Sequence, residues 1–287
     1  MFLDSYGRFI FYDGAVGTML QKHGLRPGER PDILNITAPD AVEDVHRMYV
    51  DAGSDIIVTN TFGANAAALR ATGYSPGEMI TAAVAIARRA SGGRAKVALD
   101  IGPLGQLVEP LGDVKLESAY EMFREQAEAG ERAGAELAAI ETMSDLTELE
   151  AALLAVKENT SLPVLATMTF DKTGFTFTGC APESFAETAQ RLGADAIGLN
   201  CSLEPSEMIA TAERIAKTSD LPLIVKPNAG LPDSRTGLYS IGPAEFARQM
   251  VPFAGIGARI IGGCCGTTPD YIRELRKVFL SLPDTAF

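Results

Sequence analysis

The sequence predicts an α/β fold, a (β/α)8 TIM barrel that occupies residues 1–287 as a single domain. Eight short apolar runs alternate with eight amphipathic segments of helical period. Each run is nearly continuous in apolar residues, which is typical of parallel strands that helices cover. An open, doubly wound sheet is the alternative, but a count of eight βα units favours a closed barrel.

The elements follow one another in a regular order. The expected strands lie near residues 9–12, 56–59, 96–100, 137–141, 163–169, 196–200, 222–226 and 259–262. The expected helices lie near 39–52, 76–91, 117–133, 145–159, 182–192, 205–218, 243–254 and 268–281. Four of the expected helices are followed by a similar short sequence, with a glycine just past the last turn. A glycine there can adopt the left-handed conformation that ends a helix. The stretch 101–116 is long for a βα loop, so we expect it to cover the barrel mouth.

Composition excludes several classes of function. The chain has 287 residues, of which 46% are hydrophobic, so it can bury a large core. A net charge of −12 and a pI near 4.7 argue against nucleic acid or an anionic membrane as a partner. No apolar run is long enough to span a bilayer, and the start at 1–6 lacks the pattern of a secretory signal. With four cysteines and no disulfide pattern, we expect a cytoplasmic protein.

Three of the four cysteines lie at the ends of two expected strands. Cys201 follows the sixth apolar run, and Cys264 and Cys265 follow the eighth within a glycine-rich segment. Three thiolates can bind one zinc ion and leave its fourth position open, as in catalytic sites. Buried thiols or a Cys264–Cys265 disulfide are the alternatives. The ligand count favours the metal, and Cys180 is interpreted as a packing or loop residue.

The other strand ends are polar and rich in acids. In order they are Asp13, Thr59, Asn60, Thr61, Asp100, Glu141, Thr142, Thr169, Asn200, Lys226, Pro227 and Asn228. Barrel active sites lie at these ends, so Asp13 and Glu141 are candidates for holding a substrate ammonium group. A turn cap is the alternative for Asp13, because glycine follows it. That glycine segment is not a phosphate loop, since it lacks the required lysine.

Histidine chemistry is not indicated. The chain has two histidines, and neither His23 nor His46 clearly follows an expected strand. A histidine-built metal site or a Ser-His-Asp triad is therefore not supported. We expect His46, in the middle of the helix near 39–52, to lie on the surface.

With these residues in view, the chain resembles the homocysteine S-methyltransferase family. That family includes the homocysteine-binding module of cobalamin-dependent methionine synthase and betaine–homocysteine methyltransferase. The resemblance covers essentially the whole chain. It rests on the segments 13–18, 59–62, 141–143, 200–201, 227–230 and, most specifically, 262–269 with the sequence Gly-Gly-Cys-Cys-Gly-Thr-Thr-Pro.

The resemblance implies a zinc-dependent enzyme of methionine biosynthesis. Zinc on Cys201, Cys264 and Cys265 would activate homocysteine as a zinc thiolate, which then accepts a methyl group to give methionine. Asp13 and Glu141 would lie at the homocysteine amino group. The other substrate contacts implied by the resemblance are Gly14, Thr18, Asn60, Asn200 and Asn228.

The methyl donor is the open question. The chain lacks a corrinoid-binding Asp-x-His-x-x-Gly motif, because Tyr49 stands where glycine is required, and it lacks a second barrel for a folate. It has no tryptophan for an aromatic cage around betaine. Thr142 also stands at a position where the betaine enzymes look to have a tyrosine. We therefore expect a methylated corrinoid, such as methylcobalamin or a separate corrinoid protein. The alternatives for the reaction are S-methylmethionine or betaine as the donor, or another thiol as the acceptor. The chain could instead be a barrel that senses zinc or thiols without activity, or a fragment of a larger enzyme.

Overall fold

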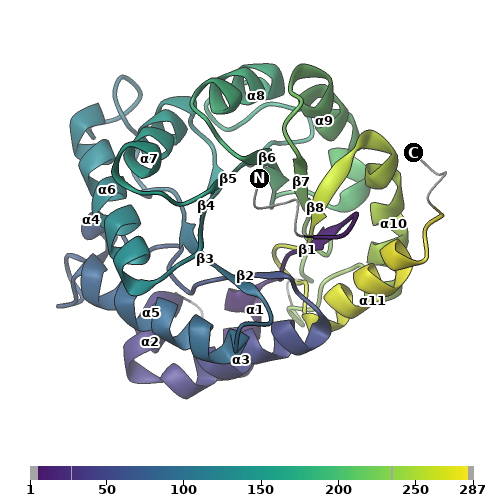
Figure 1. Ribbon diagram of the computed structural model, residues 1–287, viewed down its shortest axis with the longest axis horizontal. Helices are drawn as coiled ribbons and strands as arrows, with labels where there is room; N and C mark the ends of the chain where they lie inside the picture. Colours follow the sequence, from purple (N-terminus) through teal and green to yellow (C-terminus); the bar gives the residue numbers. More distant parts are fainter. Residues whose placement is uncertain (1–5, 27, 234, 284–287) are drawn as a thin grey trace.

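Eight parallel strands form one sheet in the order β1-β8-β7-β6-β5-β4-β3-β2. The computed structural model describes residues 6–26, 28–233 and 235–283. The strands are β1 (Ile10–Phe11), β2 (Ile56–Val58), β3 (Lys96–Ile101), β4 (Leu137–Met143), β5 (Val164–Met168), β6 (Ala196–Asn200), β7 (Leu223–Lys226) and β8 (Ala258–Ile261). Between β1 and β2 a parallel bridge joins Tyr12 to Ile56 and closes the ring seen in Figure 1. The predicted barrel is confirmed.

Eight long helices surround this ring. They are α3 (Pro39–Ala52), α5 (Pro76–Ser91), α6 (Leu116–Ala133), α7 (Leu146–Asn159), α8 (Pro182–Arg191), α9 (Pro205–Thr218), α10 (Pro243–Ile256) and α11 (Pro269–Leu280). Each begins and ends within two residues of its expected bounds. The glycines at 53, 134, 193 and 257 all have a positive φ just past a helix, as their position predicts.

The sequence reasoning missed four short helical segments. These are α1 (Val16–Lys22), the 3₁₀ turn η2 (Pro31–Ile33), α2 (Leu34–Thr37) and α4 (Ala66–Leu69). Each is too short to show a helical period, which needs a window of about 11 residues or more. All lie in the connections that follow β1 and β2.

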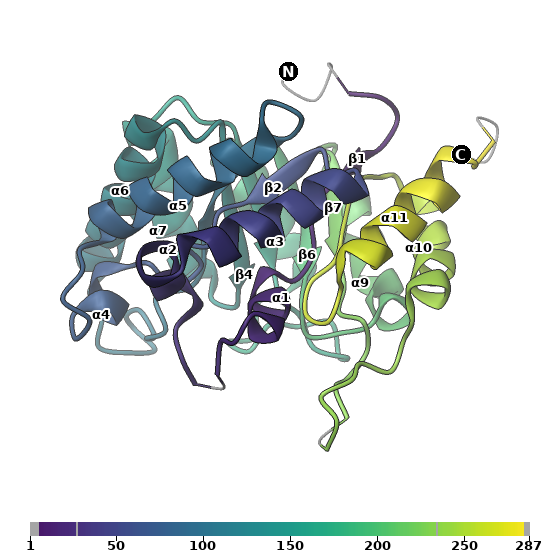
Figure 2. The same ribbon diagram turned by 90° about the horizontal axis from the view of Figure 1, so that it is seen from below.

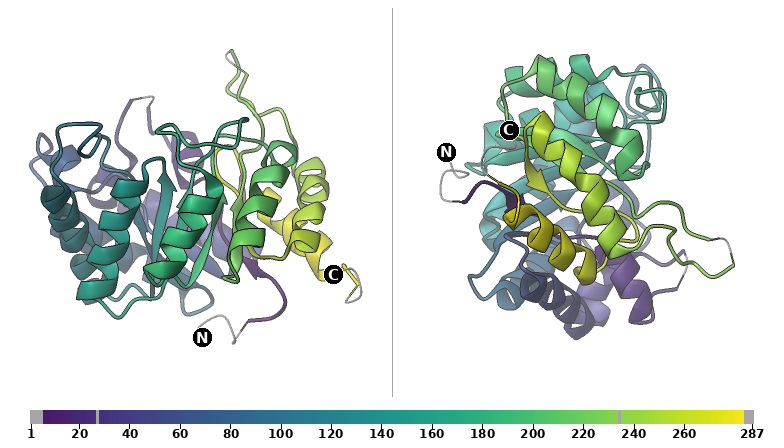
Figure 3. Two further views of the ribbon diagram at one scale, coloured as in Figure 1. Left: turned by 90° about the horizontal axis from the view of Figure 1, so that it is seen from above. Right: turned by 90° about the vertical axis from the view of Figure 1, so that its right-hand side faces the viewer.

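The loops that follow the strands gather at one end of the barrel. In Figure 2 this end faces downward, with α1, α4 and the yellow-green segment 229–242. The same segment points upward in the left view of Figure 3 and reaches beyond the other loops. An antiparallel bridge between Pro232 and Tyr239 pairs its two arms. The cysteines and acids that follow the strands therefore share one face with this segment.

Two expectations were wrong or not supported. His46 is fully buried and finds no hydrogen-bond partner in the part of the chain that the structure describes, and burial lowers its pKa to about 4. It belongs to the inner stripe of α3, four residues after Val42 and three before Tyr49, a helical spacing that the sequence reasoning overlooked. The segment 102–115 does not line the cavity at the barrel mouth that is described below.

Among the described helices, none combines the length and the apolar composition needed to cross a bilayer. Residues 1–5, on which the expectation about a secretory signal rests, lie outside the described residues.

Candidate metal centre and substrate pocket

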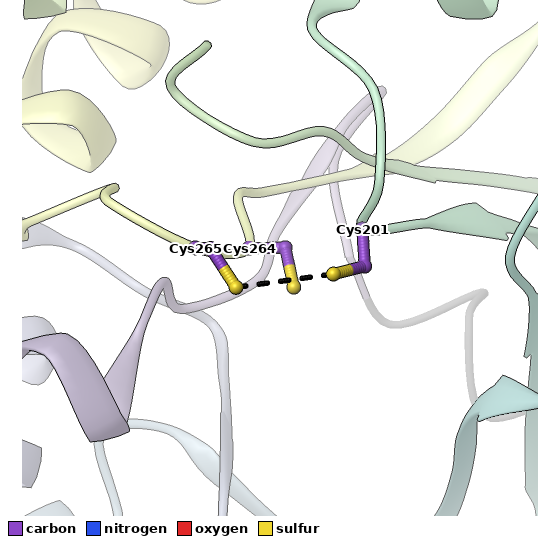
Figure 4. Close-up of side chains that lie close together, drawn as sticks. All are labelled: Cys201, Cys264 and Cys265. Carbon is purple, nitrogen blue, oxygen red and sulfur yellow. Dashed lines mark hydrogen bonds between the residues drawn. The ribbon is translucent and has the colours of Figure 1, made fainter. Parts of the chain in front are cut away.

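Cys201, Cys264 and Cys265 meet at the barrel mouth. Their three Sγ atoms lie within 4.8 Å of one another, and those of Cys201 and Cys265 are 3.8 Å apart. Figure 4 shows the three side chains converging from two segments of the chain. A tetrahedral zinc with bonds of about 2.3 Å to sulfur sets its sulfurs about 3.8 Å apart. The three thiols therefore fit a zinc ion, and all are free rather than joined in a disulfide.

The turn after β6 holds Cys201 in an unusual backbone conformation. Cys201 and Ser202 have φ values of 63° and 61°, in the left-handed region that non-glycine residues seldom adopt. The amide of Leu203 donates to the carbonyl of Cys201 at 2.7 Å, which tightens the turn. The Cys201 amide donates to the carbonyl of Lys226 at 3.1 Å. Such strained residues often mark functional sites, where the surrounding structure holds them.

The turn after β8 is fixed by close backbone packing. A Cβ at Gly263 would lie 2.3 Å from Oγ1 of Thr267, so only glycine fits there. The Thr267 hydroxyl donates to the carbonyl of Cys264 at 2.6 Å, and Tyr49 donates its hydroxyl to the carbonyl of Thr267 at 2.7 Å. The spacing of the glycine-rich motif thus aims adjacent cysteines at one point.

The three thiols share charge unevenly. Hydrogen bonds from Cys264 and Cys265 lower the pKa of Cys201 to about 3. The pKa of Cys264 is raised well above its usual value, and that of Cys265 to about 12, because both donate to the Cys201 thiolate. A second or third thiolate at this distance needs a cation to offset the repulsion, which is what a divalent metal provides. Cys180 lies outside this cluster, and burial raises its pKa to about 11.

A cavity of about 370 Å³ opens beside the cysteines. This volume is in the range of small-molecule sites. Its lining contains all three cysteines and four of the predicted substrate contacts, namely Gly14, Thr18, Asn60 and Glu141. It also contains Asp100 and Lys226. Thiols and charged groups from the ends of five strands, β3, β4, β6, β7 and β8, therefore face one space.

The other three predicted contacts lie behind this lining. Asp13 is fully buried, and its carboxylate accepts a hydrogen bond from the Val58 amide at 2.8 Å. The Asn200 side chain bonds to Thr142 at 2.7 Å and accepts from the Thr167 hydroxyl at 2.7 Å. The side-chain oxygen of Asn228 accepts from the Cys265 amide at 3.0 Å. These bonds brace the site, and contact with a substrate stays a prediction for each of the three.

Sequence reasoning missed Lys226 as a site residue. Its ammonium group lies 2.5 Å from a Glu141 carboxylate oxygen and 4.0 Å from the centre of the Tyr12 ring. Burial alone would lower the pKa of Lys226, but the Glu141 carboxylate raises it, so the lysine stays charged. Asp100 was also passed over. Both residues lie at or near the end of an apolar strand, the same signal that identified Glu141.

Burial dominates the charge state of the remaining acids. It raises the pKa of Asp13 to about 7, against the opposing effects of Lys226 and the Val58 amide. Burial also raises the pKa of Asp100 well above its usual value, and the negative charge of Glu141 adds to this rise. The cavity lining thus holds the carboxyl groups of Asp100 and Glu141 and the charged Lys226, with the carboxyl group of Asp13 behind it.

Comparison with known proteins gives a consistent result. A model of the homocysteine S-methyltransferase family matches residues 10–279. The methionine synthases of Mycobacterium leprae and Mycobacterium tuberculosis share 33% and 34% sequence identity with this chain, and each alignment covers 93% of it. The chain spans about a quarter of their length, 24% in each case.

Solved structures share the fold. The metallated form of the homocysteine methyltransferase MmuM from Escherichia coli matches with a TM-score of 0.82 at 24% identity, over 96% of this chain and 98% of that one. Its apo form matches with a TM-score of 0.74 at 23% identity, over 96% and 97% of the two chains.

Proposed function

The chain belongs to the homocysteine S-methyltransferase family, and from this premise we propose that it is a zinc-dependent enzyme that methylates the sulfur of homocysteine to give methionine. One observation carries the proposal. Three thiols spaced for one tetrahedral ion line the same cavity as carboxyl groups that can receive an amino acid. A site that held only a structural metal would be closed by a fourth protein ligand.

The residues have separate roles in this proposal. Cys201, Cys264 and Cys265 hold the metal, which when bound would favour the deprotonated form of a substrate thiol near neutral pH. Glu141 and its neighbours hold the amino group and so orient the sulfur. Methyl transfer to a thiolate is a direct displacement that needs no general base near the carbon. The two histidines fit this chemistry, since the buried His46 lies in α3 and His23 follows α1, away from the cavity lining.

For the donor we propose a methylated corrinoid, free or carried by a separate protein. Large apolar side chains are exposed on the loops around the mouth, with Phe177 84% exposed and Leu231 and Leu238 each 70% exposed. Five more exposed apolar residues of these loops and of the adjoining helix start are Phe62, Leu107, Leu111, Leu116 and Phe175. An apolar rim that faces solvent favours contact with a bulky partner. A small donor would instead favour loops that close over it.

A panel of methyl donors tests this proposal. Purified zinc-loaded protein is incubated with homocysteine and with methylcobalamin, a methylated corrinoid protein, methyltetrahydrofolate, S-methylmethionine or betaine, and methionine is measured. We expect activity with methylcobalamin at high concentration, more with the corrinoid protein, and little with methyltetrahydrofolate alone. Turnover with betaine or S-methylmethionine and none with a corrinoid would refute the donor. No methionine with any donor would favour another thiol acceptor or a sensing role.

A further inference from the structure

Asp100 differs from the other acids of the cavity in having no partner for its side chain. It is the second-last residue of β3, is only 5% exposed, and its Oδ1 atom has no hydrogen-bond partner among the described residues. Its backbone is held firmly, because its amide donates to the Thr59 hydroxyl at 3.0 Å and its carbonyl accepts from the Thr61 hydroxyl at 2.7 Å. A buried carboxyl group without partners is costly and calls for an explanation.

The neighbouring charges show what Asp100 lacks. Glu141 is already paired with Lys226 at 2.5 Å, and Asp13 accepts from the Val58 amide. Asp100 faces these three groups across the cavity wall, and their charges all act on it. Of the two carboxyl groups in the cavity lining, Glu141 has its cation and Asp100 has none among the described residues, so a further cation beside Asp100 would give it a partner.

We propose that Asp100 binds the ammonium group of the substrate amino acid, while Lys226 acts as a positioning residue that holds Glu141 beside it. This assignment rests on the proposed function, because it places homocysteine between the thiols and the acids of one cavity. A substrate ammonium ion at Asp100 would supply the missing cation. A thiol without an amino group would leave the carboxyl group unpaired, so the site selects amino thiols.

Proton exchange follows from the same placement. Burial and the charge of Glu141 raise the pKa of Asp100, which favours the protonated form of its carboxyl group while no cation lies beside it. An ammonium ion beside it favours the ionised form. Binding of homocysteine should therefore release the Asp100 proton in addition to the thiol proton.

Calorimetric titration of the zinc-loaded protein tests the assignment with two ligands. Homocysteine carries the amino group, and 4-mercaptobutanoate is the same molecule without it. We expect Asp100→Asn to weaken homocysteine binding by about 10–100-fold and to change 4-mercaptobutanoate binding by less than about twofold, with zinc content unchanged. Titration in two buffers of different ionisation enthalpy should show fewer protons released by Asp100→Asn than by the wild type.

Two further variants complete the experiment. Glu148→Gln is the matched control, because Glu148 is another buried carboxyl group, 4% exposed, that accepts from the Leu104 amide and lies outside the cavity lining. It should bind both ligands as the wild type does. Asp100→Ser should reproduce the selective loss, which keeps the test valid if one replacement disturbs folding.

The possible results distinguish a failure of the Asp100 assignment from a failure of the proposed function. Unchanged homocysteine affinity in both Asp100 variants, with normal binding by the wild type, overturns the assignment alone. An equal loss for both ligands also overturns it, because the effect would then not depend on the amino group. If the wild type binds no homocysteine, the proposed function fails and this assignment fails with it.

Discussion

The two halves of the barrel mouth are built in different ways. The thiol half, Cys201, Cys264 and Cys265, is shaped by two short turns whose backbone conformations are strained or specific to glycine. The acid half, Asp13, Asp100 and Glu141, comes from the ends of three strands, and two of its members, Asp13 and Glu141, have partners far along the chain. Residue type and spacing along the chain thus identify the first half, whereas only the folded structure reveals the charge balance of the second.

Lys226 connects the two halves. Its carbonyl accepts a hydrogen bond from the Cys201 amide at 3.1 Å, and its ammonium group pairs with Glu141 at 2.5 Å. The end of β7 therefore positions one of the three thiols through the backbone and pairs with an acid through the side chain. Changes confined to one half should affect metal and substrate separately, and a change of the Lys226 side chain should act on the acid half, because its contact to Cys201 is made by the backbone.

The largest effect is expected from the thiol half. Cys264→Ala removes one of three metal ligands, so zinc affinity should fall by more than about 100-fold and methyl transfer should be lost. Zinc content by atomic emission and methionine formation measure this. Cys180→Ala is the control and should keep both. Full zinc retention in Cys264→Ala would contradict the metal site, and zinc loss in Cys180→Ala would mean that the ligands are misassigned.

A smaller effect is expected from the residue that joins the halves. Lys226→Met leaves Glu141 buried without a partner, which should lower the free energy of unfolding by about 3–5 kcal/mol. Adding Glu141→Gln should restore most of this loss. Urea denaturation measures both.

An ion pair of equal length on the surface provides the control. Lys172 lies 2.5 Å from Glu207, but its side chain is 71% exposed. Lys172→Met should therefore lower the free energy of unfolding far less than Lys226→Met does, because solvent screens the exposed pair. Equal losses for the two lysine variants would show that burial does not set the strength of the Lys226 pair.

The smallest effect concerns the acid half and pH. Burial raises the pKa of Asp13 from 3.8 to about 7 in the metal-free protein, so the folded state binds this proton more tightly than the unfolded state. Stability should therefore fall as the pH rises from about 4 to about 7, by on the order of 2–4 kcal/mol.

Replacing the carboxyl group isolates the contribution of Asp13. Asp13→Asn should remove part of the slope in denaturation curves of the metal-free protein, and Asp100 contributes in the same direction. Asp113→Asn, in an exposed loop, should leave the slope unchanged. A slope that persists fully in Asp13→Asn would mean that Asp13 is ionised in the folded protein throughout this range.

Much of the fold could be predicted because its signals are local. Each long helix carries its own period, and each strand is a short apolar run with a polar end. The short helices after β1 and β2 carry no such period, and their form depends on packing at the barrel mouth. His46 was misplaced for a related reason, because a polar residue within the buried stripe of α3 interrupts the apolar pattern.

The candidate site likewise has a part that the sequence predicts and a part that only the structure reveals. Cysteine is rare in this chain, so three cysteines at two strand ends indicate a metal without further context. Asp100, Glu141 and Lys226 all lie at or near the ends of apolar strands, and no local feature ranks them. The pairing of Lys226 with Glu141 is a contact across 85 residues. Only the closed barrel shows that Glu141 already has a partner and that Asp100 has none.

X-ray absorption at the zinc edge tests the central claim most directly. In the resting protein we expect three sulfur ligands at about 2.3 Å and one lighter atom. Addition of homocysteine should replace the lighter atom with a fourth sulfur at the same distance. A spectrum that keeps three sulfurs in saturating homocysteine, or that has four before it is added, would contradict an open zinc site that binds the substrate thiol.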